Sequence, residues 1–168
     1  MTYAVVYSSR TGNTELLAQA IRRTLGEQGC VYFGGPEGPV PNADLLFAGF
    51  WTNQGTADGP MQEFLKGWDR GPVALFGTAG FGGDAEYFAG ILKRVEALLP
   101  AGLAVEEGFM CQGRMPSAVR ARYQAALEKD PGNPQMQALL ENFDRALSHP
   151  DETDQEAAAQ WARRRISG

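Results

Sequence analysis

The sequence predicts an α/β fold in which a doubly wound sheet of five parallel strands, in the order 2-1-3-4-5, is followed by extra C-terminal helices. Short apolar runs alternate with amphipathic helical stretches over the first two thirds of the chain. This alternation is typical of a parallel sheet covered by helices on both faces. After residue 115 the pattern becomes helical only. We therefore expect one domain over residues 1–168, with a helical extension over about residues 116–168.

Strands are expected where short β-branched, aromatic or apolar runs stand between turn residues. The run from Leu45 to Phe50 is almost wholly apolar, as expected for a strand that is covered on both faces. The last run is interrupted by Glu106 and Glu107. The expected strands are residues 3–7, 30–33, 45–50, 73–76 and 103–110.

Helices are expected where apolar residues recur at helical spacing behind a capping residue. Asp58 and Asp84 can each cap a helix, and Thr153 with Glu156 has the spacing of a capping box. The C-terminal helices are expected to pack their apolar faces on the α/β core, and Trp161 is expected to anchor the last of them. The expected helices are residues 13–28, 59–68, a helix that follows Asp84, and residues 116–129, 135–148 and 153–166.

Composition narrows the function classes. The formal net charge of -5 argues against nucleic acid as a partner, because binding to phosphate backbones relies on clusters of Lys and Arg. The sequence has no apolar stretch long enough to span a membrane and no secretion signal at its N-terminus. Cys30 and Cys111 form no CxxC pair, and with His149 as the sole histidine a zinc site is not expected. We expect a cytoplasmic protein with free thiols.

The loop between the first expected strand and the first expected helix reads SRTGNT over residues 9–14. A phosphate group needs several hydrogen-bond donors in a small concave space, and backbone N–H groups at a helix start provide some of them. Gly12 allows the backbone to come close to such a group, and Arg10 is the one cation of the loop. The other side-chain donors are those of Ser9, Thr11, Asn13 and Thr14.

The same loop lacks the Gly-Lys-Ser of nucleoside-triphosphate loops and the GxGxxG of dinucleotide sites, so it suits a single terminal phosphate. Out of context it is also an ordinary polar turn with a helix cap. At this first strand–helix junction, however, S-x-T-G-N-T resembles the phosphate loop with which the flavodoxin family binds flavin mononucleotide (FMN). The resemblance covers about residues 3–110 and implies a flavodoxin-like fold with FMN as cofactor.

In doubly wound sheets, ligands lie outside the carboxyl ends of the strands where the strand order reverses. The loops after the third and fourth expected strands, residues 51–58 and 77–83, end there. The resemblance implies that each loop contributes an aromatic residue to the flavin ring. The cofactor-binding residues expected from this resemblance are Ser9, Arg10, Thr11, Gly12, Asn13, Thr14, Trp51, Thr52, Asn53, Gly55, Thr78, Ala79, Gly80, Phe81, Gly82 and Gly83.

Several roles at these loops stay open. Trp51 stacks on the ring or packs in the core, and Tyr87 is an alternative to Phe81 as the second aromatic residue. Thr52 stands where flavodoxins often have glycine. After the fifth expected strand, Cys111 either approaches the flavin or is a small buried residue. No residue is assigned as catalytic.

Three functions are compatible with this pattern. The first is an electron carrier that passes electrons from a reductase to an acceptor enzyme, and the second is an NAD(P)H-dependent FMN oxidoreductase of quinone-reductase type. The third is a protein that kept the fold and lost the flavin, against which the near-complete phosphate loop argues. The segments GFWTNQGTAD, FGTAGFGG and FMCQGRMP resemble those of small flavodoxin-family proteins of anaerobes, some of which accompany bilirubin-reducing enzymes. A tetrapyrrole or bilin reductase is therefore one candidate acceptor.

Overall fold

The computed structural model describes residues 1–82 and 84–167. Within this part of the chain, five parallel strands form a sheet in the order β2-β1-β3-β5-β6, and the short strand β4 pairs antiparallel with β3. Because β4 lies outside the parallel path, this is the predicted order 2-1-3-4-5, which is confirmed. The strands are β1 (Tyr3–Tyr7), β2 (Cys30–Gly34), β3 (Leu45–Asn53), β4 (Thr56–Ala57), β5 (Val73–Ala79) and β6 (Phe109–Gln112).

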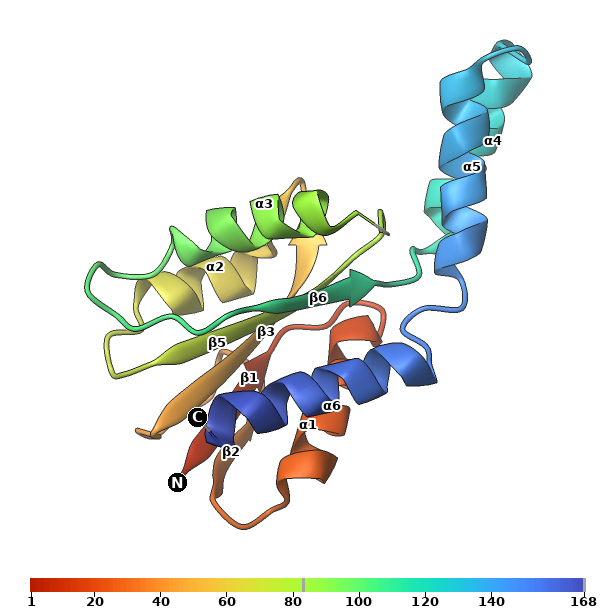
Figure 1. Cartoon of the computed structure of the whole chain (residues 1–168). Coiled ribbons are helices and arrows are strands. Elements are labelled where there is room, and N and C mark those ends of the chain that lie inside the picture. The colour runs from red at the N-terminus through yellow and green to blue at the C-terminus, as the bar shows by residue number, and fades with distance from the viewer. Residues whose placement is uncertain (83, 168) are drawn as a thin grey trace.

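Helices cover both faces of the sheet, with α2 and α3 on one face and α1 and α6 on the other (Figure 1). Side chains of β1 alternate between the two layers: Ala4 and Val6 pack toward α2 and α3, whereas Tyr3 and Val5 pack toward α1 and α6. The helices are α1 (Asn13–Leu25), α2 (Gly59–Lys66), α3 (Ala85–Glu96), α4 (Ser117–Lys129), α5 (Pro134–Ala146) and α6 (Glu152–Ser167).

The C-terminal extension divides into two parts. Helix α6 lies against the sheet, and its Trp161 is buried among Phe47, Phe76 and Phe109 and donates its indole N–H to the Glu107 carbonyl at 2.7 Å. This anchor was predicted and is confirmed. In contrast, α4 and α5 form a hairpin that projects away from the sheet (Figure 1), and α4 has no buried residue. The expectation that all of these helices pack on the core is therefore wrong for α4 and most of α5.

The ends of several elements differ from the prediction. The expected fifth strand over residues 103–110 makes only an isolated bridge at Val105, and β6 begins at Phe109, because Glu106 and Glu107 are exposed and break the apolar run. The strands β3 and β5 continue three residues beyond the expected ends. Trp51, which was expected in a loop, therefore lies in a strand.

The predicted capping residues are confirmed for α2 and α3 but not for α6. Asp58 and Asp84 cap α2 and α3 as predicted. At the start of α6 the capping box consists of Asp151 and Asp154, each of which accepts the backbone N–H of the other at 2.8–2.9 Å. The predicted box of Thr153 and Glu156 is wrong because the helix begins at Glu152, one residue before Thr153. No helix of the described residues has the length and apolar character needed to cross a bilayer.

Candidate functional site

The predicted loops meet at the carboxyl edge of the sheet. Trp51 of β3 pairs with Thr78 of β5, and Thr78 pairs with Cys111 of β6, so the ends of these strands lie side by side. The loop after β1 leads directly into α1 at the same edge. The strand order reverses between β1 and β3, where doubly wound sheets bind their ligands.

The segment over residues 9–14 offers a row of free donors. Gly12 has the left-handed φ of 88° and caps α1 without a side-chain hydrogen bond, and open space surrounds the position of a Cβ there. Among the described residues, the backbone N–H groups of residues 11–14 have no hydrogen-bond acceptor. Free N–H groups at the positive end of a helix dipole attract an anion. The geometry therefore suits a phosphate group.

The side chains of this segment divide into two groups. The Thr14 hydroxyl is fully buried, donates to the Phe50 carbonyl at 3.2 Å and lies 3.3 Å from the Thr78 hydroxyl. The Asn13 amide donates to the Arg114 carbonyl at 2.8 Å. Thr14 thus fastens the segment to the core, and Asn13 fastens it to the loop after β6. The hydroxyls of Ser9 and Thr11 remain to face an anion, although the Ser9 oxygen also accepts the N–H of Glu15 at 3.3 Å.

Arg10 and Trp51 lie next to each other. The guanidinium carbon of Arg10 stands 5.5 Å from the centroid of the Trp51 ring, within the range of a cation–π contact. Arg10 is exposed and Trp51 is half-buried. The structure thus brings the cation of the phosphate segment onto the aromatic residue that was predicted to stack on a flavin.

Residues 51–58 form a tight hairpin instead of the expected open loop. Thr52 pairs with Ala57, and the turn has left-handed φ values at Gln54 and Gly55. This pair of positive φ values is typical of the two-residue turns that join antiparallel strands. Arg94 of α3 donates to the Gly55 carbonyl at 2.7 Å, and Asn53 is exposed at the end of β3. The Thr52 hydroxyl oxygen is buried and has no partner among the described residues.

The carboxylate of Asp58 stabilises this hairpin through hydrogen bonds to the backbone. This carboxylate is fully buried and accepts the backbone N–H groups of Trp51 at 3.2 Å and Met61 at 3.4 Å. Burial raises the pKa of the Asp58 carboxyl, and hydrogen bonds from Ser8, Trp51 and Met61 oppose part of that rise. The sequence predicted this residue as a helix cap but not its hold on Trp51.

The second loop that was expected to contact the flavin ring follows β5. Thr78 and Ala79 are buried at the strand end, and Gly80 and Gly82 lie close to the side chains of Met115 and Gln112. Phe81 is 41% exposed and meets the edge of Tyr87 at a centroid distance of 6.4 Å, so both aromatic residues remain available at the rim. The predicted Gly83 lies outside the described residues.

Two side-chain amides meet at the Gly80 carbonyl. Gln112 of β6 and Asn142 of α5 each donate to this oxygen at 3.0 Å, and Gln112 also donates to the Asn142 carbonyl oxygen at 3.1 Å. Sequence reasoning missed Asn142. One signal was available. Asn142 directly precedes Phe143, which belongs to the apolar stripe of α5, and a polar side chain buried beside such a stripe needs a hydrogen-bond partner.

Cys111, which was predicted either to approach the flavin or to be buried, packs in the core. Cys111 is buried, and burial raises the pKa of its thiol, so the residue is a small core side chain at the end of β6.

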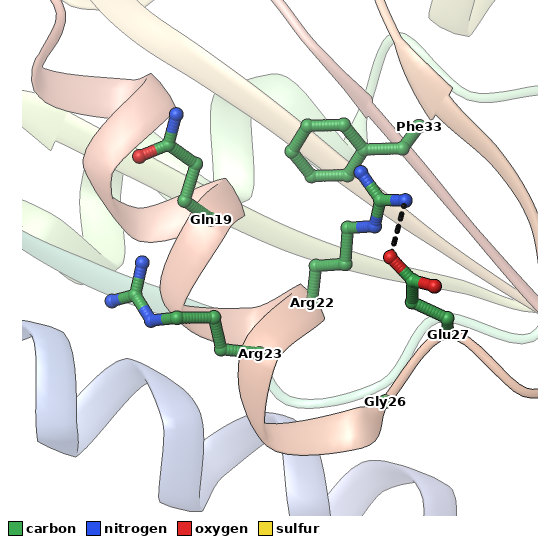
Figure 2. A pocket seen from close by; sticks show the side chains of 6 residues that line it. All are labelled: Gln19, Arg22, Arg23, Gly26, Glu27 and Phe33. Atoms are coloured by element: carbon green, nitrogen blue, oxygen red, sulfur yellow. Dashed lines mark hydrogen bonds and ion pairs between the residues drawn. The ribbon is translucent and has the colours of Figure 1, made fainter.

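A surface hollow at the other end of α1 is lined by Gln19, Arg22, Arg23, Gly26, Glu27 and Phe33. There Arg22 lies between the Phe33 ring and Glu27 (Figure 2), so its charge is already partnered. This hollow lies away from the loops that the sequence predicted.

Comparisons with known proteins show the family of this chain. A family model described as a flavodoxin domain matches residues 4–163. A flavodoxin-like domain-containing protein BilS of Clostridium symbiosum (strain WAL-14163) is 41% identical over 174 residues, covering 94% of this chain and 92% of that protein. A protein of the same description from Clostridioides difficile (strain CD3) is 30% identical and covers 97% of this chain and 95% of its own length.

Solved structures of flavodoxins share the fold. A flavodoxin of Streptococcus pneumoniae TIGR4 superposes with a TM-score of 0.57 at 15% sequence identity, and the match covers 99% of both chains. At this identity the likeness concerns the arrangement of strands and helices.

Proposed function

The chain belongs to the flavodoxin family, and we propose that it carries electrons on one non-covalently bound FMN, from a reductase to an acceptor enzyme. FMN is the cofactor of this family, and flavodoxins hold it where the strand order reverses beside the first strand. When bound, FMN supplies the exchange of one or two electrons. The protein supplies position and electrostatics.

The observation that carries this proposal is the set of backbone N–H groups without an acceptor at the start of α1. Free N–H groups over residues 11–14 lie beside the left-handed Gly12, where open space leaves room for a phosphate group. Ser9 and Thr11 add hydroxyl donors, and Arg10 adds one positive charge. The residues present therefore fit the phosphate of FMN.

The ring is proposed to lie between the two loops at the carboxyl edge. Trp51 offers an aromatic face, and Asp58 holds its backbone in place. The unpartnered buried hydroxyl of Thr52 is a polar atom at the same place that a ligand can satisfy. The proposed ring contacts are Trp51, Thr52, Asn53, Gly55, Thr78, Ala79, Gly80, Phe81 and Gly82.

For the acceptor we propose an enzyme that reduces a tetrapyrrole such as a bilin. Support comes from the loop segments at residues 49–58, 76–83 and 109–116, which resemble those of flavodoxin-family proteins that accompany bilirubin reduction. The two related proteins named BilS agree with a redox role. We place the exchange in the cytoplasm, where thiols such as Cys30 and Cys111 remain reduced.

The phosphate contact is tested with Thr11→Val, which removes the hydroxyl and keeps the side-chain shape. We expect FMN to bind at least about tenfold more weakly, because hydrogen bonds to charged groups contribute about 1.5–3 kcal/mol. Riboflavin, which has no phosphate, should bind as it does to the wild type. Dissociation constants measured from the quenching of flavin fluorescence decide this, and Thr24→Val at the other end of α1 is the control. An equal loss for both ligands would contradict the assigned role of the loop.

The carrier function is tested by anaerobic reduction of the FMN-loaded protein. Dithionite should reduce the bound flavin fully, whereas NADH or NADPH alone should leave its visible absorption unchanged over minutes. Rapid bleaching by either nucleotide would favour the oxidoreductase of quinone-reductase type. A purified protein that takes up no FMN would refute both functions.

A further inference from the structure

We propose that Asn142, on helix α5 of the C-terminal extension, is a positioning residue of the flavin site. By holding the Gly80 carbonyl, it orients the peptide group that presents the Phe81 N–H to the flavin ring. The inference rests on the proposed function, since it concerns how that site receives its ring. It assigns a role at the site to a helix that lies far from the phosphate loop in sequence.

Asn142 is placed to act on this one carbonyl. It is 8% exposed, and its amide nitrogen donates to the Gly80 oxygen at 3.0 Å. Gln112 donates to the same oxygen at 3.0 Å and to the Asn142 oxygen at 3.1 Å. The three groups form a closed triangle in which a single backbone oxygen accepts two amide donors. A carbonyl held from two sides has little freedom to rotate.

Packing fixes the helix that carries Asn142. Its neighbours Phe143 and Ala146 are buried, whereas the rest of the hairpin projects away from the sheet. Figure 1 shows this end of α5 near the carboxyl end of β6. Met115 packs directly against Gly80, so close that a Cβ at this position would meet its side chain at 2.6 Å. Met115 therefore limits the movement of the loop at Gly80.

The consequence for a ligand follows from peptide geometry. The peptide unit that carries the Gly80 carbonyl also carries the Phe81 N–H, and in a planar trans peptide the two bonds point in opposite directions. Since the carbonyl points toward Gln112 and Asn142, the N–H points away from both of these side chains. Among the described residues this N–H has no acceptor. A flavin ring has polar edge atoms that can accept it.

The experiment compares two isosteric changes two residues apart in α5. Asn142→Asp keeps the oxygen that Gln112 needs but replaces the donor to Gly80 with a second acceptor. Asp144→Asn breaks the exposed ion pair with Arg120 and leaves the triangle intact. We expect Asn142→Asp to weaken FMN and riboflavin by the same factor, about tenfold, because the contact concerns the ring. Asp144→Asn should bind both flavins as the wild type does.

A second readout separates positioning from mere stability. A donor aimed at the ring stabilises the electron-rich reduced flavin, so its loss should move the potential of the bound flavin to a more negative value. The potential is compared in Gln112→Met, which removes a donor to the same carbonyl without adding a charge. Unchanged affinity in Asn142→Asp together with an unchanged potential in Gln112→Met would overturn the inference, and so would a loss confined to FMN. If Asn142→Asp does not fold, Gln112→Met decides, because it removes the other donor to the same carbonyl. Equal weakening of both flavins then supports the inference, and wild-type binding overturns it. Wild-type protein that binds no flavin would refute the proposed function instead.

Discussion

Helix α6 and the α4–α5 hairpin belong to the same C-terminal extension, but they relate to the sheet in opposite ways (Figure 1). In α6 the residues Ala158, Trp161 and Ala162 are buried against the sheet and α1. In α4 no residue is buried, and its larger apolar side chains are only partly buried. The comparison shows that helical spacing predicts a helix without predicting its partner.

The physical difference lies in the faces of the two helices. The small residues Ala158 and Ala162 let α6 approach α1 closely, and Trp161 fills the space among Phe47 and its neighbours in the sheet. Helix α4 has only Val119, Tyr123 and Leu127 as larger apolar side chains, and this stripe is too narrow to cover a sheet. We infer that α6 is part of the fold's stability, whereas the hairpin acts at the site through the end of α5.

The largest effect is expected from truncating the anchor of α6. Trp161→Ala should lower the free energy of unfolding by about 3–5 kcal/mol, because it leaves a cavity among aromatic side chains and an unpaired Glu107 carbonyl. Urea denaturation followed by circular dichroism measures this. Tyr123→Ala in α4 is the matched aromatic truncation, and it should cost less than about 1 kcal/mol because the side chain is only half-buried. Similar losses in the two variants would mean that the hairpin contributes as much stability as α6.

The positions of the strands followed from sequence because their signals are local, and the predicted order is the common arrangement of five strands that alternate with helices. Apolar runs such as Leu45 to Phe50 are buried on both faces as their composition predicted. The ends of strands were less predictable. Trp51 and Thr52 were expected in a loop because polar and glycine residues follow them, but they extend β3 because Thr56 and Ala57 fold back to pair with its end. The Gln54-Gly55 turn that allows this carries only a weak local signal.

The candidate site was predictable where one short segment carries the chemistry. Residues 9–14 lie at the predicted junction, with Gly12 in the left-handed conformation that only glycine adopts easily. The directions of the side chains were not predictable, since Thr14 turns inward to Phe50. The contact of Asn142 with Gly80 joins residues 62 positions apart, and no local pattern reports such a contact.

A smaller effect is expected at the junction where the chain passes from the hairpin into α6. Asp151 caps α6, and the backbone N–H of Asp154 holds the pKa of its carboxyl below the ordinary value, with the charge of His149 acting in the same direction. A depressed pKa in the folded state means that the carboxylate stabilises the protein above its unfolded pKa of about 3.9. That contribution is lost as pH falls through the lower folded value.

Asp151→Asn keeps a capping oxygen but removes the charge. Its melting temperature should therefore lie slightly below that of the wild type at pH 7, and the difference should shrink as pH falls below about 4 and through the lower folded pKa of Asp151. Thermal melts followed by circular dichroism across this range measure the difference. Asp130→Asn, which removes the same charge from the exposed turn of the hairpin, should follow the wild type at every pH. A constant difference between Asp151→Asn and wild type down to pH 2 would show that the cap of α6 owes nothing to its charge, and the junction would then resemble the hairpin more than the core.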